Sequence, residues 1–102
     1  MATYTINLEQ GNLLKVNFGE PAQNDRIVRD AEKRLEELIA SGEIAGGELI
    51  RINGPASLPV AMVLAHRLNH LYQAVACYDP KLSAYVIAIA HGDKYHVGDL
   101  VD

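Results

Sequence analysis

A strand–helix–strand unit in the middle of the chain constrains the fold most. The segment "GELIRIN" (47–53) alternates like a strand, "LPVAMVLAHRLNH" (58–70) is an apolar helical run, and "AVACY" (74–78) is again strand-like. Two strands joined through a helix lie parallel in one sheet, and the crossover between them is right-handed. This unit therefore predicts an α/β fold in which at least two strands are parallel.

The flanking segments extend this sheet. "TYTINLE" (3–9) and "NLLKVNF" (12–18) predict a hairpin, residues 24–40 repeat apolar side chains at helical spacing, and "AYVIAIA" (84–90) predicts a further strand. The predicted order is strand, strand, helix, strand, helix, strand, strand, with a mixed sheet in a small Rossmann-like three-layer fold. Asn24 and Ser57 are the expected N-caps of the two helices, and the second helix is apolar enough to be buried on two sides.

Length and composition limit the function classes. A chain of 102 residues forms one domain, and 49% hydrophobic with 22% charged residues is ordinary for a globular protein. The net charge of −4 argues against a protein that grips long duplex nucleic acid. The longest uncharged apolar run (58–65) is too short to span a bilayer, so we expect a cytoplasmic protein without membrane contact. The final "HVGDLVD" reads as a turn and the start of another strand, which leaves open that 1–102 is the front part of a longer chain.

Two polar segments fall at the carboxyl edge of the predicted sheet, where open α/β sheets hold ligands. The loop Asn53 to Ser57, which contains Gly54, follows one parallel strand, and the turn Asp79-Pro80-Lys81-Leu82 follows the other. The loop also opens a helix whose positive dipole end favours a phosphate, and Lys81 adds a cation. The alternative interpretation is that Asn53, Ser57 and Asp79 only form turns and caps.

The histidines fall at the opposite, amino edge. The second helix ends there with His66, Arg67, Asn69 and His70, and His91 ends the strand that returns antiparallel. Asp79 and the histidines are thus too far apart to act on one bond within a single molecule. They can cooperate only if the histidine edge of one molecule meets the carboxyl edge of another, a head-to-tail contact that closes a ring or forms a filament.

The segments "LAHRLNH", "YDPKL", the following apolar strand with its histidine, and "GDLVD" resemble the small CRISPR-associated ring nucleases of type III antiviral systems, specifically the X-three family. The resemblance covers roughly residues 47–102. It implies a compact α/β dimer that is distantly similar to nucleotide-sensing CARF domains. Members bind the second messenger cyclic tetra-adenylate between dimers stacked head-to-tail and cut it to linear di-adenylate, which switches the defence off.

The resemblance also assigns roles to residues. It implies a catalytic histidine near the end of the second helix, and this position falls on Asn69 or, with a shift of one, on His70. Asp79 completes the predicted catalytic set. The predicted ligand-binding set is Asn53, Gly54, Ser57, Lys81 and Arg67, with Arg51 as a further cation and Tyr72 or Tyr95 as stacking partners of adenine. Lys81 stands where the family has an arginine, so it keeps the charge but loses the bidentate fork.

Members of this family also resemble manganese-dependent exonucleases that act on RNA 3′ ends. This implies Mn²⁺ as a cofactor, with Asp79, His70 and His91 as candidate ligands of oxygen and imidazole type. Three alternatives to a ring nuclease remain open at this point. One is a sensor domain that binds the cyclic nucleotide and regulates an attached effector, and another is an exoribonuclease that degrades polyadenylated RNA. The third is a structural assembly domain, which would neither bind nor cleave the nucleotide.

Overall fold

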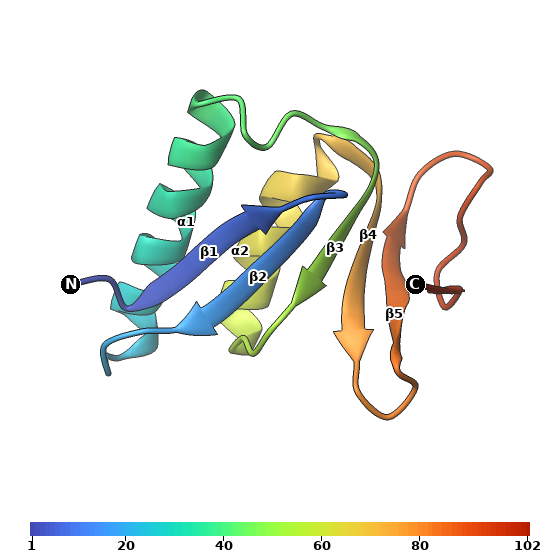
Figure 1. Cartoon of the computed structure of the whole chain (residues 1–102). Helices are drawn as coiled ribbons and strands as arrows, with labels where there is room; N and C mark the ends of the chain where they lie inside the picture. Colours follow the sequence, from blue (N-terminus) through green and yellow to red (C-terminus); the bar gives the residue numbers. More distant parts are fainter.

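A computed structural model describes residues 1–102 and contains one six-stranded mixed sheet and two helices (Figure 1). Its strands lie side by side in the order of the sequence; β2, β3 and β4 are parallel, and the other neighbours are antiparallel. The α/β class, the mixed sheet and the predicted order of elements are therefore confirmed. The elements are β1 (Tyr4–Glu9), β2 (Leu13–Phe18), α1 (Asn24–Ala40), β3 (Gly47–Asn53), α2 (Leu58–Asn69), β4 (Tyr72–Asp79), β5 (Ala84–Ala90) and β6 (Leu100–Val101).

The prediction of three layers is wrong, because both helices lie on the same face of the sheet (Figure 1). One apolar core joins buried residues of α1 and α2 to those of β1 through β4. The crossovers β2–α1–β3 and β3–α2–β4 each advance by one strand in the same direction. Right-handed crossovers that advance in the same direction place their helices on one face, so the molecule has two layers.

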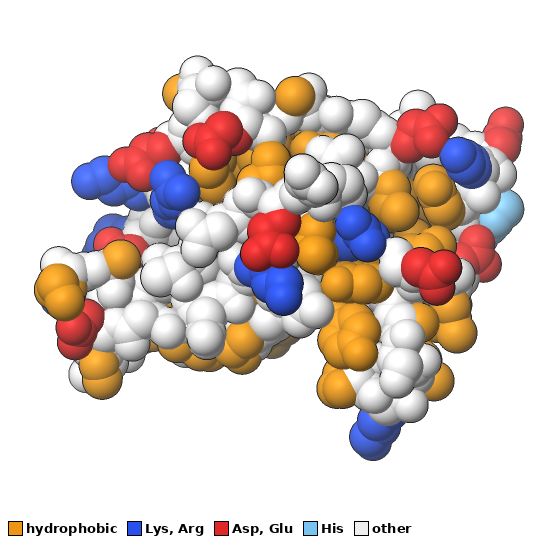
Figure 2. Space-filling model, viewed as in Figure 1, with side chains coloured by type: hydrophobic (Ala, Val, Ile, Leu, Met, Phe, Trp, Pro, Cys, Tyr) orange, Lys and Arg blue, Asp and Glu red, His pale blue; other side chains and the backbone are white.

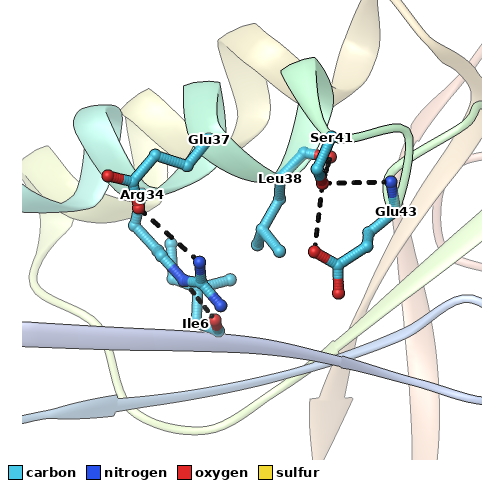
Figure 3. A network of polar contacts seen from close by, with 6 residues as sticks. All are labelled: Ile6, Arg34, Glu37, Leu38, Ser41 and Glu43. Carbon is cyan, nitrogen blue, oxygen red and sulfur yellow. Dashed lines mark hydrogen bonds and ion pairs between the residues drawn. The ribbon is translucent and has the colours of Figure 1, made fainter.

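Helix α1 presents a regular apolar stripe to the sheet, formed by Ile27, Ala31, Leu35 and Leu38. Polar contacts also connect α1 to the sheet (Figure 3). Arg34 donates from Nε to the Ile6 carbonyl oxygen at 3.1 Å, and its guanidinium lies 3.6 Å from the Glu37 carboxylate. At its end, Ser41 Oγ donates to the Leu38 carbonyl oxygen at 3.0 Å, and Gly42 follows with a φ of +84°. Asn24 is the first helical residue and not the N-cap; the cap is Gln23, whose side chain makes no capping bond.

Helix α2 is buried on one side only, contrary to the prediction. Val60, Leu64 and Leu68 pack into the core, whereas Leu58 and Met62 are 75% and 66% exposed. The helices cover only part of the sheet, so an apolar groove of about 460 Å³ remains between α2 and strands β4 and β5. Neither helix is long and apolar enough to cross a membrane.

The other face of the sheet, which we call the open face, carries no helix (Figure 1). A second, smaller cluster of buried side chains lies there, formed by Ala74, Ala76, Tyr85 and Ile87, and Tyr95 and Val101 of the C-terminal segment pack on it. Hydrophobic side chains on this face gather over β4, β5 and the C-terminal segment, while β1 and β2 present mostly polar groups (Figure 2). The open face is thus partly polar and partly aromatic.

Candidate functional site

The loop between β3 and α2 is held firmly at the carboxyl edge of the sheet. Tyr4 Oη donates to the Pro55 carbonyl oxygen at 2.6 Å, and burial raises the pKa of Tyr4 to about 12, so the phenol stays protonated. Ser57 Oγ accepts from the Val60 N–H at 3.4 Å, which confirms Ser57 as the N-cap of α2. The loop is therefore a preformed feature.

Gly54 of this loop serves packing. Its φ is +138°, and a Cβ at this position would lie 1.8 Å from the Val16 carbonyl oxygen of β2. Only a glycine allows β2 and the loop to approach so closely. The ligand-binding role predicted for Gly54 stays a prediction, while the structural role is evident.

The turn between β4 and β5 lies at the same edge, as the parallel pairing of β3 and β4 requires. Asp79 Oδ1 accepts from the N–H groups of Lys81 and Leu82 at 2.8 and 3.4 Å, so its carboxylate stabilises the turn. Lys81 is exposed and makes no ion pair. The turn thus presents one free cation beside a carboxylate that is already engaged.

The amino edge brings Asn69, His70 and His91 together. The Asn69 side-chain oxygen is hydrogen-bonded to His91 Nε2, and the His91 N–H donates to the Gln73 carbonyl oxygen at 2.6 Å. The exposed His70 ring packs edge-to-face on His66, with ring centroids 5.1 Å apart. Two histidines from different elements and an amide therefore surround the end of α2, as the strand directions predicted.

Arg67 lies at this edge but turns towards α1. Its guanidinium is paired with the Glu36 carboxylate and lies 3.6 Å from Glu32. These pairs satisfy the charge of Arg67 within the chain. The structure therefore does not bring Arg67 together with the loop at the carboxyl edge, where the other predicted ligand-binding residues lie.

The candidate manganese ligands do not meet within one chain. Asp79 ends β4, whereas His70 and His91 lie at its start, and a strand of this length separates its ends by roughly 23 Å. No group of three or more His, Cys, Asp or Glu side chains is close enough to hold a metal ion. The residues of a single molecule thus do not fit Mn²⁺, and a site shared by two molecules stays a prediction.

The structure decides which tyrosines of β4 a base can reach. Tyr72 cannot stack on a base, because it is only 3% exposed and its hydroxyl donates to Asn12 Oδ1 at 3.3 Å. Tyr78, in contrast, is 38% exposed on the open face beside Tyr85. The period-two pattern of β4 places Tyr78 on a sheet face, but it does not say that this end of the face lacks a cover.

The groove beside α2 is chemically different from both polar edges. Eleven of its twelve lining residues are hydrophobic, and Cys77 forms part of its wall. Desolvation there raises the pKa of the Cys77 thiol, which disfavours a reactive thiolate. Gly54, Ala56 and Tyr78 also line the groove, so it adjoins the carboxyl edge, but its walls are almost entirely apolar.

The family of the chain follows from a comparison of its sequence with family models. The model described as CRISPR-associated protein (Cas_csx3) matches residues 22–102, which includes both polar edges. The chain belongs to this family. The Cas_csx3 match spans α1 and every later element, so both edges lie within the part of the chain that the family shares. No curated protein and no solved structure matches the chain.

Proposed function

We propose that this Cas_csx3 protein binds cyclic tetra-adenylate and cleaves it to linear di-adenylate, which down-regulates type III CRISPR defence. Membership of the CRISPR-associated family supports the biological setting. The observation that carries the proposal is the separation of two polar edges on one sheet. The loop before α2 and the β4–β5 turn with the free cation Lys81 occupy one edge. The histidine cluster occupies the other edge.

The carboxyl edge is the ligand-holding edge in this proposal. Pro59 has no N–H and the Val60 N–H is capped by Ser57, so the first turn of α2 offers few free donors. The attraction for phosphate comes from the dipole of the twelve-residue helix, the N–H groups of the loop and the charge of Lys81. Asn53 adds a polar side chain at the end of β3.

His70 is the group that moves a proton in this proposal. The 2′-hydroxyl of one ribose attacks the adjacent phosphorus, a 2′,3′-cyclic phosphate forms, and the bond to the 5′-oxygen of the next nucleotide breaks. Imidazole can take the proton from the hydroxyl or give one to the leaving oxygen, whereas the amide of Asn69 can do neither at neutral pH. Asn69 instead orients His91 through their hydrogen bond. Two such cuts convert the ring into two di-adenylates.

The two edges act on one ligand only when two molecules stack head-to-tail. About 23 Å of sheet separates the two edges within a chain, so groups at both edges cannot reach the same phosphodiester. In a head-to-tail contact, the His70 edge of one molecule faces ligand held by the Lys81 edge of the next. We therefore propose dimers that stack into a tetramer or a filament.

The proposal is tested by incubating the protein with cyclic tetra-adenylate and separating the products by chromatography. Wild-type protein is expected to release linear di-adenylate. His70→Ala is expected to lower the single-turnover rate by about 100-fold or more, as for loss of a general acid or base, while the Kd for the ligand changes little. His96→Ala, which removes an exposed histidine of the C-terminal segment, is the matched control and should keep the rate.

Each alternative has its own outcome. Retained turnover in His70→Ala would eliminate His70 as the catalytic group. Tight binding by wild-type protein without any product would indicate a sensor domain. Faster degradation of linear polyadenylated RNA than of the cyclic ligand would indicate an exoribonuclease.

A further inference from the structure

An ordered group of polar and aromatic side chains lies on the open face, at the carboxyl end of the sheet. We call it the tyrosine platform; its members are Lys15, Arg51, Asn53, Tyr78 and Tyr85. Lys15 and Asn53 are Cα partners in the pairing of β2 with β3, and Tyr78 and Tyr85 are partners in the pairing of β4 with β5. Four members thus form a row across four neighbouring strands, which lie about 4.8 Å apart, and Arg51 lies two residues before Asn53 on β3.

Tyr85 is the fixed base of this platform. It is 8% exposed, its hydroxyl accepts from Asn53 Nδ2 at 3.3 Å, and the Arg51 guanidinium lies 5.4 Å from its ring centroid. Arg51 is itself held by the carbonyl oxygens of Gly11 and Asp102, at 2.9 and 3.2 Å. These hydrogen bonds hold the guanidinium in place, so the platform combines a rigid aromatic ring with a fixed cation.

Tyr78 and Asn53 are the members that remain free for a ligand. The Tyr78 ring packs edge-to-face on Tyr85, with centroids 5.1 Å apart, and stays 38% exposed. Asn53 uses one of its two N–H donors on Tyr85. Its second N–H and its carbonyl oxygen are unused, and this donor–acceptor pair matches N7 and the N6 amino group of adenine.

We propose that the tyrosine platform is the adenine-binding subsite of the ligand. This inference rests on the proposed function and adds the determinant of base specificity. The base stacks on Tyr78, its N6 and N7 edge meets the Asn53 amide, and Lys15 lies on the phosphate side of the base. Because Asn53 is the last residue of β3 and directly precedes the loop before α2, one residue links recognition of the base to the edge that holds phosphate.

The test measures affinity in the His70→Ala background, so that cleavage does not consume the ligand. Tyr78→Leu is expected to raise the Kd for cyclic tetra-adenylate about 5- to 100-fold, as for loss of one stacked base, while Tyr78→Phe keeps the ring and the affinity. Phe18→Leu is the matched control. Phe18 is 41% exposed at the same end of the sheet but packs edge-to-face on Tyr4 of the core, so its replacement should leave the Kd unchanged.

The Asn53 contact is tested separately with linear tetra-adenylate and tetra-uridylate. Wild-type protein should bind the adenylate more tightly, and Asn53→Leu should remove this preference. Thermal melting of every variant identifies a loss of binding that comes from unfolding.

The outcomes separate this inference from the proposed function. If wild-type protein cleaves the ring but Tyr78→Leu binds as well as Phe18→Leu, the platform is overturned and the ring nuclease stands. If cyclic ligand is not bound but linear tetra-adenylate binds through Tyr78, the ring nuclease is overturned and the platform stands. If neither nucleotide binds, both are overturned.

Discussion

Asp30 of α1 anchors the start of the chain through one carboxylate. Its Oδ2 accepts from Thr3 Oγ1 at 2.6 Å and from the Thr3 N–H at 3.0 Å, and Thr3 is 1% exposed. These hydrogen bonds, with smaller contributions from Arg26 and Lys33, lower the pKa of Asp30 below its usual 3.8. The ionised form is therefore the one that stabilises the fold.

We predict that Asp30→Asn lowers the melting temperature at pH 7. A carboxyl whose pKa is lowered by folding stabilises the native state above the unfolded pKa of 3.8, and this contribution disappears as the pH falls through the folded pKa. The difference between wild type and Asp30→Asn should thus shrink on acidification below about pH 4, as followed by circular dichroism. A difference that persists unchanged at pH 2 would contradict this interpretation of the Thr3 bonds.

At the scale of elements, the close approach of β2 to the loop before α2 depends on Gly54. We predict that Gly54→Ala destabilises the protein by more than about 1 kcal/mol, because the positive φ is strained and the new Cβ meets the Val16 carbonyl oxygen. Urea denaturation measures this change. Gly42→Ala is the control: its φ is also positive, +84°, but no atom lies within 4 Å of the added Cβ, so it should cost less. Equal costs would show that the contact with β2 is unimportant.

At the scale of the whole molecule, the two polar edges predict that an active site forms between molecules. His70→Ala damages only the histidine edge, and Lys81→Glu only the carboxyl edge. Each variant alone should lose most of its activity. A mixture of the two restores contacts in which both facing edges are intact. With random head-to-tail pairing of equal amounts, about a quarter of the contacts and of the wild-type rate should return.

The control for this mixture is His70→Ala combined with a variant that carries both changes on one chain. That pair has no intact histidine edge, so no rate should return. Failure of the first mixture to exceed this control would mean that cleavage does not depend on head-to-tail contact.

The sequence by itself determined the elements and the edges on which their polar residues lie. Hydrophobic periodicity and helix- and strand-breaking residues predicted the five strands and two helices with nearly their observed bounds. This worked because the alternation of "GELIRIN" and the Ser57 cap are local signals. Chain direction then separated Asp79 from His70 and His91, since parallel strands share their carboxyl edge.

Only the tertiary structure decided the layers and what covers each face. The sequence predicted three layers, but both crossovers advance in one direction, so both helices lie on one face and the open face carries no helix. The exposure of a strand residue depends on which elements, distant in sequence, pack over it. Tyr72 and Tyr78 are six residues apart in β4, yet they are 3% and 38% exposed. The pairing of Arg67 with Glu36 and the assembly of Asn53, Tyr78 and Tyr85 likewise join residues from separate elements, which no local pattern specifies.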